Sequence, residues 1–353
     1  MDLSTLLKTA VEKGASDIHI TVGKPPMMRL SGELVPIVES GPLTAEHTRA
    51  LIYALLYDEQ KRRLEETWEL DCSFALTGVS RFRLNVLNTR NGVEAVMRVI
   101  PSKIPTAQEL ALMPSIAALA DLPRGLVLVT GPTGSGKSTT LACLLNMINE
   151  KKKSHILTIE DPIEFTYEAK ASLIRQREVG QHTKSFSHAL RAALREDPNV
   201  ILVGEMRDLE TIQLTITASE TGHLTFATLH TQDAPSTVDR IIDVFPSHQQ
   251  TQIRVQLSTS LQAVVSQILL PRKDGKGRVA AREVMIMTPA ISNLIREGKT
   301  HMIYGAIETG AKFGMISMDR SLANLVIQGV IDKELAMSKA HDKDVLAKLC
   351  SMA

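Results

Sequence analysis

The stretch LVLVTGPTGSGKSTTLACLLNMI, residues 126–148, decides the fold. Its first five residues, Leu126–Thr130, are apolar and rich in β-branched side chains, which predicts a buried strand. After Ser138, apolar residues return at the spacing of one helix face: Leu141, Leu144, Leu145 and Ile148. A glycine-rich loop therefore joins the end of a strand to the start of a helix.

That loop fits the pattern Gly-x-x-x-x-Gly-Lys-Ser. Glycines let backbone N–H groups turn inward around phosphate oxygens, and the helix start adds partial positive charge. We expect Lys137 to reach the β- and γ-phosphates of ATP, and the Ser138 hydroxyl to hold Mg²⁺. The predicted nucleotide-binding residues are Gly131, Pro132, Thr133, Gly134, Ser135, Gly136, Lys137, Ser138 and Thr139. The alternative is an ordinary glycine-rich turn with a surface lysine.

Composition limits the classes of function. The 353 residues are 44% hydrophobic and 22% charged, with net charge +1 and 3% aromatics, so no basic or stacking surface points to nucleic acid. The three cysteines are far apart, which suggests a reducing compartment and excludes a four-cysteine zinc site. We see no secretion signal and no apolar run near the roughly 18 residues of a membrane span. We expect a cytoplasmic protein that needs a partner for any membrane role.

The chain predicts two domains. PSKIP, residues 101–105, has two prolines and reads as a linker. Residues 1–100 carry short strand patterns around a helix at 43–57, which predicts a small α+β domain. One such strand, at 81–86, alternates Phe82, Leu84 and Val86 with polar residues.

Residues 106–353 form the second predicted domain. Strand patterns at 126–130, 156–159, 200–203 and 224–229 alternate with helical patterns, which predicts a largely parallel sheet with helices on both faces. Ligands of such sheets bind at the carboxyl ends of the strands. The C-terminal third reads as helical, including one apolar stripe from Ile253 to Ile268, and a helix from Thr288-Pro289 to Gly298.

Three acids follow the strand at 156–159: Glu160, Asp161 and Glu164. Carboxylates there could hold the hydration shell of Mg²⁺ or position water. We take Glu160 and Glu164 as candidate metal-site residues, and Glu164 also as catalytic. The alternative is a common turn built on Asp-Pro.

The strand at 200–203 is followed by Gly204 and Glu205. A generic P-loop protein has an acid directly after this strand, where Gly204 stands here. We predict that Glu205 orients or deprotonates the attacking water. The alternative, a capping acid for the next helix, is already served by Asp208.

His223 and His230 flank the strand at 224–229. The two positions are seven residues apart, which spans roughly 23 Å in a strand, so the two histidines cannot share a zinc ion. We expect His230 to hydrogen-bond a γ-phosphate and His223 to position neighbouring segments. A structural histidine is the alternative for each.

Arg81 and Arg83 occupy the polar face of the strand at 81–86. Such arginines are usually solvated, but a leaving γ-phosphoryl group needs cationic help, often from another domain or subunit. We predict that role for Arg81 and Arg83, with Arg98 as a further nucleotide-binding candidate.

Taken together, these motifs resemble the secretion ATPase superfamily and, within it, the type IV pilus retraction ATPases. The resemblance covers almost the whole chain. GASDIHI and GKPPMMR resemble the opening of a PAS-like N-terminal domain; GPTGSGKSTT resembles the Walker A motif. ILTIEDPIEF resembles the Asp box, ILVGEMRDLET an atypical Walker B, and TGHLTFATLHT the His box. TPAISNLIREGKT resembles a C-terminal signature associated with retraction, in which the family usually has Arg where this chain has Ser292.

The resemblance implies an α/β protein with a PAS-like N-terminal domain and a RecA-like P-loop ATPase domain with C-terminal helices. It implies an ATPase that assembles as a homohexamer at the cytoplasmic face of the inner membrane. Its partners would be a platform protein of the pilus and an accessory retraction ATPase. Work from ATP hydrolysis would draw pilins from the pilus base, which produces twitching motility. It also implies that Glu164 and Glu205 act as an acidic pair.

Other functions remain open at this point. A pilus assembly or secretion ATPase would usually carry an extra N-terminal region and a four-cysteine zinc insert, which disfavours it. An accessory retraction paralogue is close in sequence. A nucleotide-dependent scaffold with little hydrolysis is disfavoured by Glu205, and a DNA helicase by the near-neutral charge.

Overall fold

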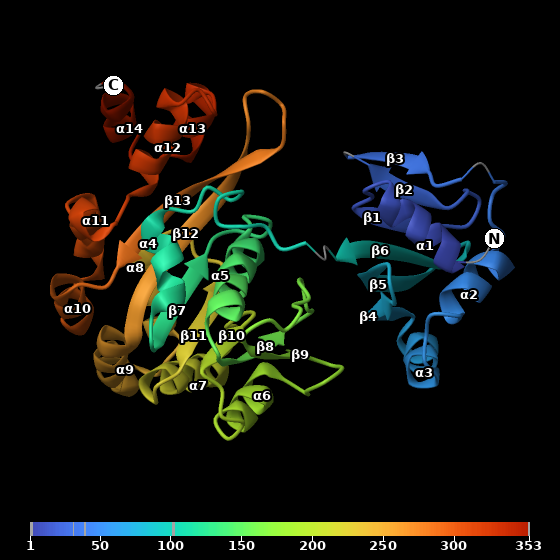
Figure 1. Cartoon of the computed structure of the whole chain (residues 1–353), viewed down its shortest axis with the longest axis horizontal. Coiled ribbons are helices and arrows are strands. Elements are labelled where there is room, and N and C mark those ends of the chain that lie inside the picture. The colour runs from blue at the N-terminus through green and yellow to red at the C-terminus, as the bar shows by residue number, and fades with distance from the viewer. Residues whose placement is uncertain (1–2, 31, 39, 101–102, 352–353) are drawn as a thin grey trace. The chain divides into compact units, whose positions relative to one another are not determined.

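The structure, a computed structural model, describes residues 3–30, 32–38, 40–100 and 103–351. The chain divides into two compact units, one of Met1–Lys103 with Glu164–Thr166 and one of Ile104–Ile163 with Tyr167–Ala353. Each has its own sheet (Figure 1). The predicted linker begins with Pro101 and Ser102, which lie outside the described residues, so its bounds stay a prediction. No helix in the described ranges combines the length and apolar character needed to cross a membrane.

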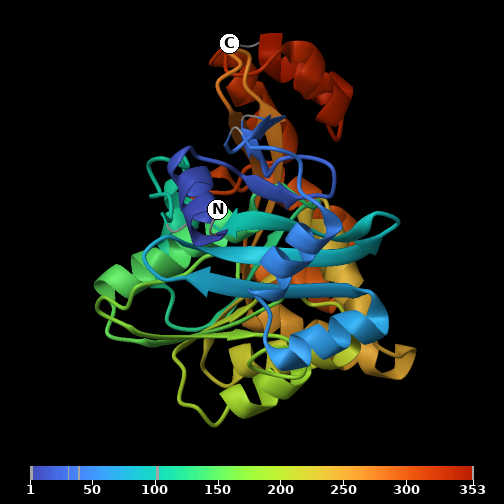
Figure 2. The same ribbon diagram turned by 90° about the vertical axis from the view of Figure 1, so that its right-hand side faces the viewer.

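The first unit is an antiparallel sheet in the order β3-β2-β1-β6-β5-β4, drawn in blue and cyan in Figure 2. Its elements in chain order are α1 (Leu3–Glu12), β1 (Asp17–Ile20), β2 (Met27–Leu30), β3 (Glu33–Pro36), α2 (Ala45–Tyr53), α3 (Asp58–Thr67), β4 (Glu69–Leu76), β5 (Ser80–Thr89) and β6 (Gly92–Ile100).

The core of this unit follows from the alternation on β5. Phe82, Leu84 and Val86 are fully buried, in one cluster with side chains of α1, α2 and α3. The residues between them face the other side of the sheet, since side chains alternate along a strand. The predicted α+β unit and its alternating strand are confirmed.

The second unit contains a seven-stranded sheet in the order β13-β12-β7-β11-β10-β8-β9. Its strands are β7 (Gly125–Thr130), β8 (His155–Glu160), β9 (Leu173–Glu178), β10 (Val200–Val203), β11 (Leu224–Leu229), β12 (Leu261–Pro271) and β13 (Arg278–Ile286). All neighbouring strands are parallel except β12 and β13, which form an antiparallel hairpin. The four predicted strands and their parallel arrangement are confirmed.

Helices cover both faces of this sheet. Along β7, Val127 and Val129 share a core cluster with α4 (Pro114–Ala117), η1 (Ala118–Asp121) and α5 (Lys137–Lys151). Leu126 and Leu128 face the other way, into a cluster with a second set of helices. That set comprises α6 (Phe186–Ala193), α7 (Leu209–Glu220), α8 (Ala234–Asp243), α9 (Ser247–Ser260), α10 (Pro289–Arg296) and α11 (Ile303–Glu308). Because both faces are covered, the central strands β7, β10 and β11 are buried along their whole length rather than alternating.

The predicted helical stripe from Ile253 to Ile268 is wrong in its second half. Helix α9 ends at Ser260, and β12 begins at Leu261. β12 is mostly buried, and it pairs with β7 on one side and β13 on the other. A short apolar run of this kind has no periodicity that separates a buried strand from a buried helix.

The prediction of a helical C-terminal third is also wrong at strand β13, whereas the described chain beyond that strand is helical, as predicted. Thr288 caps α10 by accepting a hydrogen bond from the Ile291 N–H, and Gly298 follows its end with φ of 72°. Helix α11 is preceded by η2 (Thr300–Met302) and followed by η3 (Ala311–Phe313). Then come α12 (Met318–Ile327), α13 (Lys333–Lys339) and α14 (Lys343–Ser351). Side chains of the last three helices form a separate small core against β12 and β13.

Candidate functional site

The candidate site lies at one edge of the second sheet. Strands β7, β11, β10 and β8 are adjacent and parallel, so their carboxyl ends meet there. These ends carry the glycine-rich loop after β7, His230 after β11, Glu205 after β10 and Glu160 at the end of β8. The sequence motifs, which are far apart in the chain, are thus brought to one edge.

The loop after β7 needs its glycines for conformation. Gly131, Gly134 and Gly136 have φ of 137°, 78° and 87°, in the left-handed region that favours glycine. A Cβ at Gly131 would also overlap the carbonyl oxygen of Gln267. The loop is therefore held tightly against β12 at its first glycine.

The other predicted loop residues present polar groups around this turn. Pro132, Thr133 and Gly134 are exposed, Ser135 is buried, and Ser138 and Thr139 are half-buried in the first turn of α5. Lys137 Nζ donates to the carbonyl oxygens of Gly131 at 2.8 Å and Pro132 at 3.2 Å. The lysine head group thus lies over the loop, where a cation would meet phosphate oxygens.

Glu205 follows β10 in a segment that is neither helix nor strand. Its Oε1 lies 3.0 Å from His230 Nε2, and its Oε2 lies 2.7 Å from Arg207 Nη2. Burial alone would raise the pKa of the Glu205 carboxyl, but hydrogen bonding and charge from Arg207, and then from His230, outweigh burial and lower the pKa. The carboxylate is therefore ionised at neutral pH.

Gly204 stands where a generic P-loop protein has its acid, and packing explains it. A Cβ there would lie 3.2 Å from both the Cα of Glu160 and the carbonyl oxygen of Ile159. Its N–H donates to that carbonyl, and its own carbonyl accepts from the Thr228 hydroxyl. The ends of β8, β10 and β11 are joined at this point, and the acid is moved one residue along.

Glu160 and Glu164 differ in their surroundings. Glu160 is buried, and its Oε1 accepts from the Thr158 hydroxyl at 2.6 Å and from Gln176 Nε2 at 3.4 Å. Glu164 is exposed. Across the described part of the chain, no three His, Cys, Asp or Glu side chains converge as a metal cluster. This donor set suits Mg²⁺, which keeps several waters and takes substrate phosphates as ligands, rather than an all-protein cage.

The two histidines lie at opposite ends of β11, as predicted. His223 Nδ1 lies 2.8 Å from the carbonyl oxygen of Ala218 near the end of α7, so it joins α7 to the start of the strand. His230 lies at the carboxyl end beside Glu205. Only His230 therefore belongs to the candidate site.

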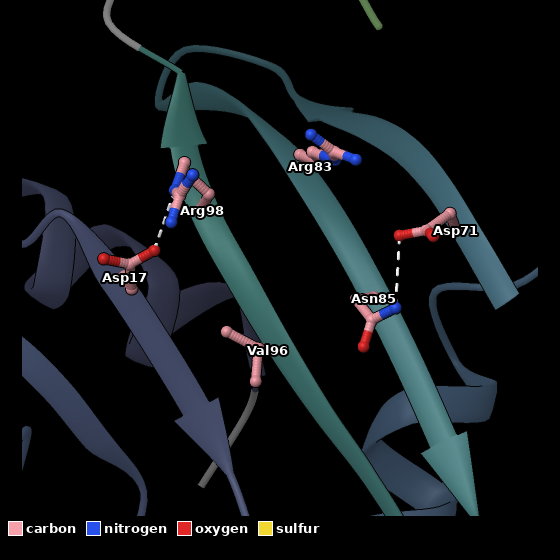
Figure 3. Close-up of a pocket in the computed structure, with 6 residues that line it drawn as sticks. All are labelled: Asp17, Asp71, Arg83, Asn85, Val96 and Arg98. Atoms are coloured by element: carbon pink, nitrogen blue, oxygen red, sulfur yellow. Dashed lines mark hydrogen bonds and ion pairs between the residues drawn. The ribbon is translucent and has the colours of Figure 1, made fainter. Parts of the chain in front are cut away.

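The predicted arginines lie on the polar face of the first unit's sheet. Figure 3 shows Arg83 and Arg98 on neighbouring strands, with the Arg98 side chain paired to Asp17. A cavity of about 310 Å³ is lined there by Asp17, Asp71, Arg83, Asn85, Val96 and Arg98. Arg81 lies on β5 with Arg83, and it donates to the Ser73 hydroxyl at 2.6 Å. The three guanidinium groups thus come from one sheet face.

Two residues of the site were missed by the sequence analysis. Arg207 lies two residues after Glu205 in a segment that is neither helix nor strand, and its guanidinium group binds the Glu205 carboxylate. That spacing was a usable signal. Gln267 contacts the loop through its side chain from a strand that was read as helix, so nothing in the local pattern pointed to it.

The C-terminal signature packs on α9 through Ser292. The Ser292 hydroxyl donates to the carbonyl oxygen of Ser258 at 2.8 Å and lies 3.4 Å from Arg296 Nη2. At this position the serine therefore joins α10 to the end of α9.

Known proteins match this chain along nearly its whole length. The model of the family described as type II/IV secretion system protein matches residues 1–330. The type IV pilus retraction ATPase PilT of Pseudomonas aeruginosa is 54% identical over 340 residues, which cover 96% of this chain and 98% of that protein. A twitching motility protein of Neisseria gonorrhoeae is 51% identical over 345 residues, covering 98% and 92%. The crystal structure of the pilus retraction motor PilT with bound ADP matches with a TM-score of 0.93 at 46% identity, covering 99% of both chains.

Proposed function

Because the chain belongs to the family of type II/IV secretion system proteins, we propose that it is an ATP-hydrolysing motor that powers retraction of a type IV pilus. The family resemblance drawn from the sequence is confirmed, as is the fold class, a small PAS-like N-terminal domain followed by a RecA-like ATPase domain. The observation that carries the proposal is the juxtaposition of a phosphate-type loop and an ionised carboxylate at one edge of a parallel sheet.

The loop and the start of α5 bind the phosphates of the nucleotide. Backbone N–H groups of the loop, to which Pro132 contributes none, and the helix N-terminus attract the anion, and Lys137 adds a full positive charge. Ser138, Glu160 and Glu164 are the residues that would hold Mg²⁺, and the bound ion would neutralise charge on the phosphate oxygens.

Glu205 acts on the attacking water. Its carboxylate is ionised, so it orients the water and accepts its proton as the γ-phosphoryl group leaves. His230 and Arg207 hold one carboxylate oxygen each, which fixes the carboxylate plane. His230 senses the γ-phosphate, and Glu164 acts as the second acid of the pair. Arg81, Arg83 and Arg98 supply positive charge to the phosphates in the assembled protein.

The motor is proposed to work as a homohexamer at the cytoplasmic face of the inner membrane. It would act on a platform protein of the pilus, with an accessory retraction ATPase as a further partner and no nucleic acid. The 54% and 51% identical relatives, which carry retraction and twitching motility in their names, support this role.

Imaging of fluorescently labelled pili tests the proposal. Cells that carry the native gene should extend and shorten their pili, whereas cells with Glu205→Gln should extend them and rarely shorten them. A mutant strain that makes no pili at all would instead indicate an assembly motor. Equal shortening in both strains would mean that this protein does not drive retraction of that pilus.

A further inference from the structure

The glycine-rich loop is fixed by one buried side chain from another strand. Gln267 lies on β12 and is 1% exposed. Its Nε2 donates to the carbonyl oxygen of Ser135 at 2.7 Å, and its Oε1 accepts from the Thr140 hydroxyl at 2.9 Å. The orientation of the amide is determined, because a carbonyl can only accept and so must face the NH₂ group. One planar amide therefore joins the loop to the first turn of α5.

Gln267 also contacts the glycines at both ends of the loop. Its backbone carbonyl leaves no room for a Cβ at Gly131, and its Nε2 would lie 3.2 Å from a Cβ at Gly136. The preceding residue, Ser266, pairs with Thr130 in the sheet, and their hydroxyl oxygens are 2.8 Å apart. The loop is thus anchored to β12 at its entrance and at its exit.

The bond to Ser135 has a consequence for the next peptide group. In a planar trans peptide the C=O of one residue and the N–H of the next point in opposite directions. Because Gln267 fixes the Ser135 carbonyl on the β12 side, the Gly136 N–H must point away from β12. Gly136 itself precedes α5 with φ of 87°, in the left-handed region that favours glycine. A residue with a side chain would adopt this conformation less readily.

We propose that Gln267 is a positioning residue for nucleotide binding, which holds the Gly136 N–H in the direction that receives a phosphate oxygen. The inference rests on the proposed function, since it takes the loop as the phosphate site. Gln267 touches no phosphate itself. Its effect is to orient a donor before the nucleotide arrives, and this preorganisation lowers the cost of binding.

The experiment compares the full-length protein with Gln267→Met, which keeps the side-chain length and removes both hydrogen bonds. Gln250→Met is the matched control, because the Gln250 amide also donates to a backbone carbonyl, that of Phe245, and lies on α9 away from the loop. The readouts are the Kd for ADP, the KM and kcat for ATP, and the melting temperature without nucleotide.

We expect Gln267→Met to raise the Kd for ADP and the KM for ATP about tenfold to a hundredfold, with a much smaller change in kcat. The loop contacts phosphates in both the ground state and the transition state, so its misplacement weakens binding in both. Gln250→Met should lower the melting temperature at most and leave Kd and KM unchanged. A Gln267→Met protein with a lower melting temperature and native Kd and KM would overturn the inference, since its role would then be structural only.

A second variant covers the case in which Gln267→Met does not fold. Thr140→Val keeps the side-chain shape and removes the hydroxyl that orients the Gln267 amide, so it should raise the same Kd and KM by a smaller factor. Unchanged values there would also overturn the inference. If the native protein neither binds ADP nor hydrolyses ATP, the proposed function itself fails, which is a distinct result.

Discussion

The carboxylate of Glu205 lies 3.0 Å from Nε2 of His230, although 24 residues lie between the two in the sequence. Pairing of these two parallel strands causes the contact, because it brings both carboxyl ends to the same edge of the sheet. The guanidinium group of Arg207 holds the other carboxylate oxygen. The acid is therefore oriented from both sides.

Arg207 sets the protonation of Glu205. Removing it in Arg207→Ala leaves the effect of burial, which raises the pKa of the carboxyl, with only His230 to oppose it. Since activity needs the ionised carboxylate, the acid limb of the kcat/KM profile for ATP should move to higher pH in the variant. Arg207→Lys keeps the charge and should shift the limb less. Superimposable acid limbs for the native protein and Arg207→Ala would contradict this assignment.

Lys137 should be essential for turnover. Its ammonium group lies over the carbonyl oxygens of Gly131 and Pro132 and supplies the full positive charge of the loop. Lys137→Ala should reduce steady-state ATP hydrolysis to background. Lys170→Ala, which removes an exposed lysine paired with Glu150, is the control and should hydrolyse ATP at the native rate. Normal turnover by Lys137→Ala would contradict the proposal that this loop binds the phosphates of ATP.

The arginines of the first unit should affect chemistry more than affinity. Arg81→Ala and Arg83→Ala are expected to lower kcat by about tenfold or more while the Kd for ADP changes little, since their charge is needed as the γ-phosphoryl group leaves. Arg62→Ala, at an exposed position of α3 in the same unit, serves as the control. Native kinetics for both Arg81→Ala and Arg83→Ala would show that these arginines take no part in hydrolysis.

Stability should depend on pH through Glu283. This acid on β13 accepts from the Ala234 N–H at 2.8 Å, and burial, with Asp233 and Asp319 nearby, raises its pKa from 4.5 to about 7. The folded protein then holds a proton that the unfolded chain releases, so this group's contribution to stability falls as pH rises from about 4.5 through about 7.

Glu283→Gln removes that titration and keeps an oxygen for Ala234. Its free energy of unfolding relative to the native protein should rise with pH across this range, by about 3 kcal/mol at most, and then level off. Denaturant unfolding at several pH values measures the difference. For Glu168→Gln, an exposed acid of the same unit, the difference should be small and flat. A flat difference for Glu283→Gln as well would mean that Glu283 is ionised in the folded protein at all these pH values.

The sequence was informative where local chemistry and periodicity agree. The apolar runs that became β7, β8, β10 and β11 are short and bounded by polar motifs, and the loop after β7 has a spacing tied to phosphate binding. Parallel strands with helical crossovers then require the motifs to meet at one edge. The order of the strands, however, comes from tertiary packing.

The limits of prediction are equally physical. The apolar stripe from Ile253 to Ile268 crosses from helix α9 into strand β12, and only pairing with β7 decides where the helix stops. Gln267 acquires its contacts to Ser135 and Thr140 through that pairing, across more than a hundred residues of chain. No local pattern carries such a contact.

Hydrolysis and binding by Glu205→Gln test the central claim most directly. The variant removes the negative charge and keeps the shape, so the Kd for ADP should stay near native while single-turnover ATP hydrolysis slows by about a hundredfold or more. Glu220→Gln, which changes an exposed acid paired with Gln256, should behave as the native protein in both assays. Hydrolysis by Glu205→Gln within a few fold of native, or loss of ADP binding, would contradict the assignment of Glu205 as the residue that activates water.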